Sequence, residues 1–207
     1  MTSQQKELYA YFAPIWDLWM TLAGHKRALT KYVKRLPLEL PASPRVLDLG
    51  CGTGIISFAL LRKFPLAQIT AVDIEPAMLR QALRLQKRYK ISPKQLNFLK
   101  GDINLLTLTP GSFDIIVTSG ALEYAQLPKT AYMLAGLLHK GGYFLNIGMR
   151  NNFLGRLHGV VYRFPIIPPD HVSRLLLDSG MKGAAHIPLN YNEFPSNLLR
   201  TGVLARK

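Results

Sequence analysis

The residues with the clearest chemical meaning are three glycines that follow a short apolar run containing an acid. The run is Val46–Leu49, its acid is Asp48, and Gly50, Gly52 and Gly54 come directly after it. Glycine has no Cβ atom, so a turn of this kind lets backbone N–H groups approach a ligand closely. A carboxylate at this place would repel a pyrophosphate and attract a ligand that carries an ammonium and a sulfonium group. The pattern therefore indicates a binding site for a small organic cation.

The spacing of the glycines also separates two kinds of nucleotide-binding turn. The dinucleotide fingerprint requires a third glycine three positions after the second, and that position holds Ile55. Residues 55–61 then follow a helical pattern, so a strand, a glycine turn and a helix are predicted in that order. A dehydrogenase is disfavoured, and a tight turn without a ligand stays the alternative.

In this setting the stretch Leu47-Asp-Leu-Gly-Cys-Gly-Thr-Gly54 resembles motif I of the class I S-adenosylmethionine-dependent methyltransferases. The resemblance covers residues 45 to about 149 well and the two ends of the chain only loosely. It implies an α/β fold, a Rossmann-like seven-stranded mixed sheet in the order 3-2-1-4-5-7-6 with an antiparallel seventh strand, helices on both faces and an N-terminal helical cap. It also implies S-adenosylmethionine as the cofactor and S-adenosylhomocysteine as the product.

The same resemblance gives roles to residues at the ends of the other predicted strands. Asp73 would accept both ribose hydroxyls, Asp102 would accept the adenine amino group, and Ile103 would stack on the adenine ring. Ser119 and Gly120, at the end of the fourth strand, would lie beside the methyl group. The expected cofactor-binding residues are Asp48, Gly50, Cys51, Gly52, Gly54, Asp73, Ile74, Met78, Asp102, Ile103, Ser119, Gly120 and, from the N-terminal segment, Tyr11.

Methyl transfer from a sulfonium uses an activated donor, so the protein mainly has to align the nucleophile and exclude water. The candidates for a general base or a substrate hydrogen bond are Glu123 and Tyr124, just past the fourth strand. Ordinary first-turn helix residues are the alternative interpretation of this pair. The run Thr118–Ala121 lacks the Asn/Asp-Pro-Pro-aromatic sequence typical of exocyclic-amino methylation, and no acids with metal-ligand spacing occur, so no metal is expected.

The length predicts a single domain over residues 1–207. Residues 1–43 would form the helical cap, residues 44–149 the cofactor-binding core, and residues 150–207 the substrate-side segment with the closing strands. The segment between the fifth strand and the last helix has no clear period, and in the family this segment shapes the substrate pocket.

The two ends of the core carry finer expectations. In the cap, Tyr9, Ala13, Trp16 and Asp17 loosely match a Tyr-x-x-x-Ala-x-x-Tyr-Asp pattern of small-molecule and lipid-type methyltransferases. A lid over cofactor and substrate, and a helix pair that packs on the core, both fit this segment. At the other end of the core, His139 is expected to be a helix C-terminal residue favoured by the helix dipole, with the fifth strand beginning at Tyr143.

The charge balance points to classes of partner. Lys and Arg outnumber Asp and Glu by 26 to 12, which gives a formal net charge of +14. Such a field attracts anionic membranes, nucleic acids or acidic substrates, or serves only solubility. The expected acceptor is a small apolar or lipid-like molecule, with peripheral contact to an anionic membrane as an addition. A basic methyltransferase, or methyltransferase-like protein, that binds RNA is the alternative.

Cysteine usage and hydropathy bear on location. Cys51 is the only cysteine, so a disulfide framework is excluded. No apolar run of about 18 residues occurs, so no transmembrane helix is predicted. Both features suit a cytoplasmic protein.

Overall fold

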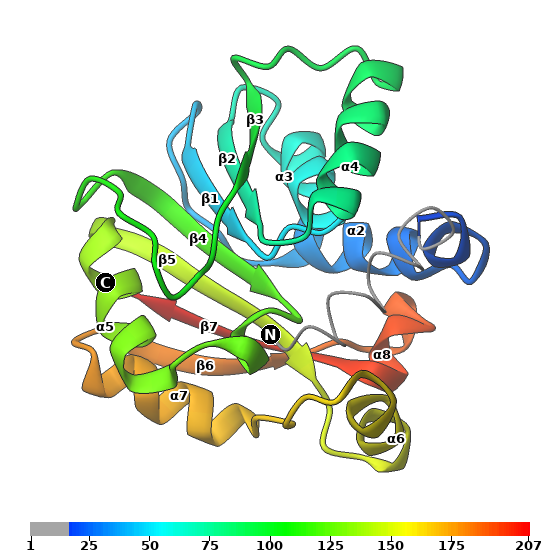
Figure 1. Cartoon of the computed structure of the whole chain (residues 1–207). Coiled ribbons are helices and arrows are strands. Elements are labelled where there is room, and N and C mark those ends of the chain that lie inside the picture. Colours follow the sequence, from blue (N-terminus) through cyan, green and yellow to red (C-terminus); the bar gives the residue numbers. More distant parts are fainter. Residues whose placement is uncertain (1–16) are drawn as a thin grey trace.

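A seven-stranded sheet forms the centre of the protein in a computed structural model that describes residues 17–207. The strand order is β3-β2-β1-β4-β5-β7-β6 (Figure 1), and every strand is parallel to the others except β7. The strands are β1 (Arg45–Leu49), β2 (Gln68–Asp73), β3 (Leu96–Lys100), β4 (Phe113–Ser119), β5 (Leu138–Met149), β6 (Lys182–Pro188) and β7 (Arg200–Arg206). The expected fold, strand order and antiparallel seventh strand are confirmed.

Helices cover both faces of this sheet. After a helical stretch over residues 17–22, the helices are α2 (His25–Arg35), α3 (Ile55–Lys63), α4 (Pro76–Arg88), α5 (Leu127–Leu137), α6 (Phe153–Tyr162), α7 (Pro169–Asp178) and the short α8 (Ser196–Leu199). The part of the chain that the structure describes also contains the short 3₁₀ turns η1 (Leu122–Tyr124) and η2 (Tyr191–Glu193). None of the helices within residues 17–207 combines the length and apolar composition needed to cross a bilayer.

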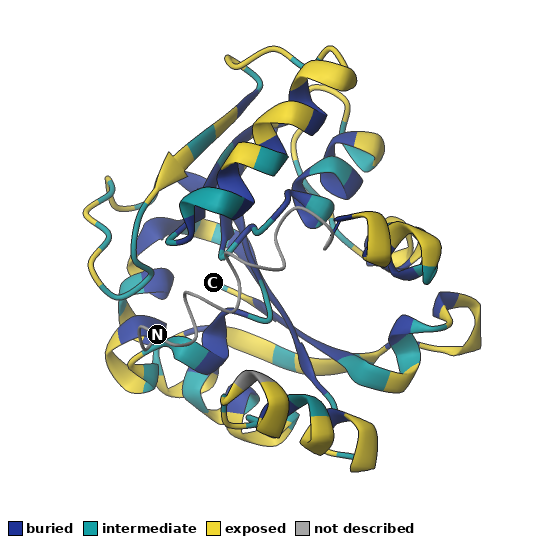
Figure 2. Cartoon of the chain, turned by 45° about the vertical axis from the view of Figure 1, so that its right-hand side comes forward, coloured by how far each residue is buried: buried dark blue, intermediate teal, exposed yellow. Residues whose placement is uncertain are grey.

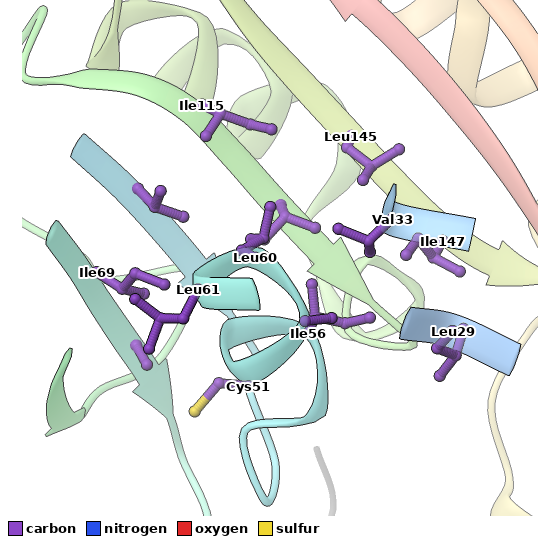
Figure 3. Packing of buried hydrophobic residues seen from close by; sticks show 14 of the residues in the cluster. Leu29, Val33, Cys51, Ile56, Leu60, Leu61, Ile69, Ile115, Leu145 and Ile147 are labelled. Atoms are coloured by element: carbon purple, nitrogen blue, oxygen red, sulfur yellow. The ribbon is translucent and has the colours of Figure 1, made fainter. Parts of the chain in front are cut away.

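Alternating side chains of the central strands divide the core into two layers. Val46 of β1 packs with helices α2 and α3 on one face, whereas the next residue, Leu47, packs with α5 and α7 on the other. Figure 3 shows the first layer, which contains Leu60 of α3, and in which Val33 of α2 lies close to Leu145 of β5. The central strands are buried, whereas the edge strands β3 and β6 and the outward helix faces are largely exposed (Figure 2). The buried central strands position the residues at their ends.

The start of β5 differs from the sequence prediction. The strand begins at Leu138 instead of Tyr143, and the register against β4 shifts where the His139–Gly142 run is accommodated. The expectation that His139 ends a helix is wrong, because its ring instead pairs with the Asp114 carboxylate of β4 at 2.7 Å. A bulge in the pairing, which periodicity does not reveal, explains the difference.

The segment after β5 contains a helix that the sequence pattern did not predict. Asn152 caps α6 by accepting a 2.8 Å hydrogen bond from the backbone N–H of Gly155. The helix ends at Arg163, whose backbone is left-handed with φ 55°. Apolar residues on several sides of α6 are exposed, so the helix lacks the single buried stripe on which sequence periodicity depends.

Candidate functional site

A cavity opens at the carboxyl ends of the parallel strands, where open α/β sheets usually bind their ligands. It is lined by Met20, Asp48, Leu49, Gly50, Cys51, Gly52, Thr53, Ile55, Ile56, Val72, Asp73, Ile74, Glu75, Met78, Gly101, Asp102, Ile103, Asn104, Ser119, Gly120, Ala121, Tyr124, His158, Phe164 and Arg200. Most of the residues predicted from the sequence to bind a cofactor therefore come together in one place.

The glycine turn after β1 has one position that is closed to a side chain and one that is open. Gly50 has φ +67°, and a Cβ atom there would lie 2.2 Å from the Cβ of Ala121, so only glycine fits. Gly52 has φ +53°, but a Cβ atom there would meet nothing within 4 Å, because this position faces the open cavity. The backbone N–H groups of Gly50 and Cys51 both donate to the Val72 carbonyl, which fixes the turn against β2.

Asp48 is fully buried between this turn and α3. One of its oxygens accepts a 2.6 Å hydrogen bond from the hydroxyl of Ser57, and the other, Oδ1, has no hydrogen-bond partner in the described part of the chain. Burial raises the pKa of Asp48 to about 7; the neighbouring Asp73 charge also raises it, while the Ser57 hydrogen bond opposes the shift. A buried carboxylate with an unused oxygen is the group that a cationic ligand would satisfy.

Two further acids stand at the ends of β2 and β3. Asp73 accepts hydrogen bonds from the backbone N–H groups of Gly52, at 2.7 Å, and Glu75, at 2.8 Å. Burial raises the pKa of Asp73, and these two hydrogen bonds counteract the rise. Asp102 lies further out and accepts from the backbone and side chain of Asn104 at 2.9 and 3.1 Å.

The N-terminal segment reaches the glycine turn through Asp17. This buried carboxylate accepts from the hydroxyl of Thr53 at 3.3 Å and pairs with Lys26 at 2.5 Å. Met20, one turn later, lines the cavity itself. The predicted contact Tyr11, together with Tyr9, Ala13 and Trp16 of the cap pattern, lies outside the described residues.

Near the last residues of β4 and the first residue of β7, the cavity has a second group of lining residues. The sequence identified only Tyr124 among them. Its ring meets that of Phe164 edge to face at 5.8 Å, and His158 of α6 lies 6.0 Å from Phe164. Burial, followed by the nearby Arg200 charge, lowers the pKa of His158 to about 4, so this ring is neutral at physiological pH. Arg200, the first residue of β7, completes the wall.

Two predicted residues do not line the cavity. Gly54 starts α3 with φ +83°, and a Cβ atom there would press on the rings of Phe58 and Phe98. Glu123 is buried against the end of β5, where one oxygen accepts a 3.3 Å hydrogen bond from the backbone N–H of Met149. The candidate base is thus placed away from the space in which an acceptor could sit.

An apolar groove meets the cavity at His158, which belongs to both. The groove runs between the chain just before α2, helix α6 and helix α8, and its lining is almost entirely apolar. Its lining residues are Trp19, His25, Leu154, Leu157, His158, Val161, Pro195, Leu198 and Leu199. His25 is held in this wall by a 2.8 Å hydrogen bond between its Nδ1 and the Ser196 hydroxyl.

The arrangement fits S-adenosylmethionine. The unpartnered Asp48 oxygen suits a cationic group, the open face of Gly52 leaves room for a ligand close to the backbone, and the acids at the ends of β2 and β3 can accept hydroxyl and amino hydrogens. Within residues 17–207, no three His, Cys, Asp or Glu side chains gather where they could hold a metal ion.

This fold and site define the class I S-adenosylmethionine-dependent methyltransferases, which confirms the class and the cofactor expected from the motif. The family model described as "Methyltransferase domain" matches residues 42–159, more than half of the chain. The chain belongs to this methyltransferase domain family.

Curated relatives match over part of the chain. A malonyl-[acyl-carrier protein] O-methyltransferase of Herminiimonas arsenicoxydans is 39% identical over 114 residues, which cover 54% of this chain and 40% of that protein. The enzyme of the same name from Magnetococcus marinus is 31% identical over 163 residues, which cover 74% of this chain and 59% of that protein. The chain thus spans about half the length of the curated relatives it matches.

Solved structures share the fold over most of the chain. The Haloferax volcanii complex of the Trm112 methyltransferase activator with a methyltransferase gives a TM-score of 0.72 at 20% identity, covering 96% of this chain and 98% of that one. Geranyl diphosphate C-methyltransferase of Streptomyces coelicolor A3(2) gives a TM-score of 0.71 at 13% identity, and the match covers 87% of this chain and 78% of that one. At these identities the likeness supports the fold alone.

Proposed function

We propose that the protein transfers a methyl group from S-adenosylmethionine to a small acceptor with an apolar body. The observation that carries the proposal is that two unlike spaces lie next to each other. The cavity at the strand ends holds a buried, unpartnered carboxylate oxygen on Asp48, and the apolar groove joins that cavity at His158. The first space suits the cofactor, and the second suits an apolar molecule that approaches it from α6 and α8.

The residues that would hold the cofactor lie along the strand ends. Asp48 with the turn Gly50–Thr53 would take the amino-acid part, Asp73 the ribose hydroxyls, and Asp102 with Ile103 the adenine. Ile74 and Met78 would add apolar contacts there. Ser119 and Gly120 close the cavity toward the acceptor side. When bound, S-adenosylmethionine supplies a methyl group already activated by its sulfonium.

The chain's own contribution is positioning and the exclusion of water. The rings of Tyr124 and Phe164 form an apolar wall at the acceptor end, and His158 lines both this end and the groove. Glu123 lies outside the cavity wall, so we assign it no proton transfer. Tyr124 is the remaining candidate for a hydrogen bond to the acceptor.

Calorimetry with three ligands tests the proposal. S-adenosylmethionine and S-adenosylhomocysteine are expected to bind, and NAD to bind more weakly than either. Transfer of a labelled methyl group to components of a lipid and quinone-precursor extract should follow, with heated protein as the control. NAD binding tighter than S-adenosylmethionine would contradict the assignment of the cavity.

Exposed apolar side chains on α6 favour an additional contact with an anionic membrane. Phe153 and Val160 are 79% and 75% exposed, and Arg150, Arg156 and Arg163 are interspersed with them in the sequence. Apolar groups that enter the interface while arginines meet lipid phosphates would give reversible attachment. The RNA-binding alternative rests on the net charge of +14.

A further inference from the structure

Arg200 brings a positive charge to the acceptor end of the cavity. It is the first residue of β7, and because β7 is antiparallel its start lies at the same sheet edge as the carboxyl ends of the other strands. Its guanidinium packs directly on Gly120, since a Cβ atom built there would lie 2.7 Å from the Nη1 atom. The charge therefore faces the point where β4 ends.

This guanidinium has unused hydrogen-bonding capacity. The Nη1 atom is buried, and it has no hydrogen-bond partner in the described part of the chain. A buried donor that makes no hydrogen bond costs about 1–3 kcal/mol, and more when the group is charged. Such a cost is recovered when an acceptor on a ligand takes the position in front of the donor.

The groups around Arg200 leave its charge largely uncompensated. Glu123 attracts it electrostatically, but no ion pair within 4.0 Å joins the two in residues 17–207, and Glu123 Oε2 has no hydrogen-bond partner there either. Burial lowers the pKa values of His25 and His158, and the Arg200 charge lowers both further, so these neighbouring rings stay neutral. Asp48 and Asp73 line the cofactor end of the cavity, so the two ends carry opposite charge.

We propose that Arg200 binds a carboxylate of the acceptor, so that the substrate is an apolar carboxylic acid and the product is its methyl ester. The inference rests on the proposed methyl-transfer function and narrows its substrate class. Arginine matches a planar carboxylate with two parallel hydrogen bonds. The apolar groove beyond His158 would take the tail of the same molecule.

The chemistry of this acceptor agrees with the residues of the cavity. A carboxylate oxygen forms the new bond to the methyl carbon, and the methyl–sulfur bond breaks with its electron pair remaining on sulfur. No proton has to be removed, because the carboxylic acid is ionised at neutral pH. An anion and a sulfonium thus give a neutral ester and a neutral thioether. Glu123, the predicted base, lies outside the cavity wall, and this acceptor does not need it.

The test measures binding with probes that differ only at the head group. Protein saturated with S-adenosylhomocysteine is titrated with decanoate, methyl decanoate and decyl phosphate in a calorimeter. Decanoate should bind at least about tenfold more tightly than the ester, and the Arg200→Gln change should remove that tenfold difference, about 1.4 kcal/mol. Arg200→Lys should retain part of it. Arg206→Gln, on the same strand and outside the cavity wall, is the control and should leave it unchanged.

Several results would overturn the inference. Equal binding of decanoate and its ester to the unaltered protein, or an unchanged preference in Arg200→Gln, would do so, and so would tighter binding of decyl phosphate than of decanoate. If Arg200→Gln weakens S-adenosylhomocysteine to the same degree, the guanidinium serves the cofactor's own carboxylate and the inference is wrong. If Arg200→Gln does not fold, Arg200→Lys is used instead. Its ratio of decanoate affinity to ester affinity should be lower than that of the unaltered protein, and an unchanged ratio would contradict the inference.

The same experiment separates this inference from the proposed function. Failure of the unaltered protein to bind S-adenosylhomocysteine removes the methyl-transfer proposal whatever the decanoate result. If S-adenosylhomocysteine binds normally but decanoate is not preferred over its ester, only the inference that the acceptor is a carboxylic acid is wrong.

Discussion

The carboxylate of Asp73, at the end of β2, accepts a 2.7 Å hydrogen bond from the backbone N–H of Gly52 in the turn after β1. Its other oxygen accepts from the backbone N–H of Glu75, which starts α4. One side chain therefore fixes both the glycine turn and the helix that follows β2. Each carboxylate oxygen has a second lone pair, so the same group can also accept hydroxyls from a ligand in the cavity.

Replacement of Asp73 by alanine should therefore affect ligand binding and stability together. The loss of hydrogen bonds to a charged group costs about 1–3 kcal/mol, so the affinity for S-adenosylhomocysteine should fall roughly tenfold. The midpoint of thermal unfolding should fall as well, because Gly52 and Glu75 lose their acceptor. Asp178→Ala, outside the cavity wall at the end of α7, is the control for both measurements. Unchanged affinity would show that Asp73 only organises the backbone.

Two glycines separate the effect of an added side chain on stability from its effect on ligand binding. Gly52 and Gly111 have φ of +53° and +65°, and a Cβ atom at either meets nothing within 4 Å. Alanine in this left-handed region costs about 1–2 kcal/mol, so Gly52→Ala and Gly111→Ala should lose similar stability. Only Gly52 lines the cavity, so Gly52→Ala alone should lose affinity for S-adenosylhomocysteine, by about tenfold or more. Equal affinity in the two variants would argue against a ligand at the turn.

The raised pKa of Asp48 predicts a pH dependence of cofactor affinity. The carboxyl has a pKa of about 7 without a ligand, and only its ionised form attracts an ammonium or sulfonium group. Affinity for S-adenosylhomocysteine should therefore rise as the pH increases from about 6 to about 8, with a proton released on binding near pH 7. Titration calorimetry in buffers of different ionisation enthalpy detects that proton. Asp48→Asn should bind more weakly and with little dependence on pH over this range.

The same pKa has a consequence for the ligand-free protein. The folded state binds the Asp48 proton more tightly than the unfolded state, whose pKa stays near 3.8. Between about pH 4 and pH 7 the folded state thus holds more protons, so this residue's contribution to the free energy of unfolding falls as the pH rises. The difference in unfolding free energy between the unaltered protein and Asp48→Asn should change across this window. A constant difference would mean that the folded-state pKa is not raised.

The sequence predicted the cofactor end of the cavity because that end depends on local patterns. Asp48, Gly50 and Gly52 lie within one strand and turn, so their spacing alone places them together. Asp73 and Asp102 follow from the rule that parallel strands end at the same edge. The prediction includes Gly54, which serves the packing of α3 against Phe58 and Phe98 and does not line the cavity.

The acceptor end was harder to predict because distant segments form it. His158 and Phe164 come from a segment whose helix has no single buried stripe, so periodicity gave no orientation. Arg200 belongs to none of the motifs in the sequence. Its place could have been inferred, since an antiparallel seventh strand begins at the ligand-binding edge of the sheet. Glu123 was predicted as a base because it follows β4. Its side chain instead packs against the end of β5, where it accepts a hydrogen bond from Met149, and this tertiary contact is not visible in the sequence.

The last prediction concerns attachment to membranes. Among the described side chains of α6, Phe153 and Val160 are the most exposed apolar ones, whereas Leu154 lines the groove and Phe164, after the helix, lines the cavity. The membrane interpretation of this segment therefore depends on the outward residues alone. Each basic residue near an anionic surface contributes about 1 kcal/mol, so Arg150, Arg156 and Arg163 together would give reversible binding that moderate salt weakens.

Co-sedimentation with vesicles of neutral and of anionic lipid, at low and moderate salt, measures this attachment. The unaltered protein should sediment with anionic vesicles at low salt, and a variant carrying Phe153→Ser and Val160→Ser should remain largely in the supernatant. Leu66→Ser, which removes a 64% exposed apolar side chain at the turn between α3 and β2, is the matched control and should behave like the unaltered protein. Equal sedimentation of the double variant would place the contact elsewhere. If vesicles bind nothing while a generic RNA binds with a steep dependence on salt, the basic surface serves nucleic acid and the membrane hypothesis is wrong, because RNA phosphates then account for the charge.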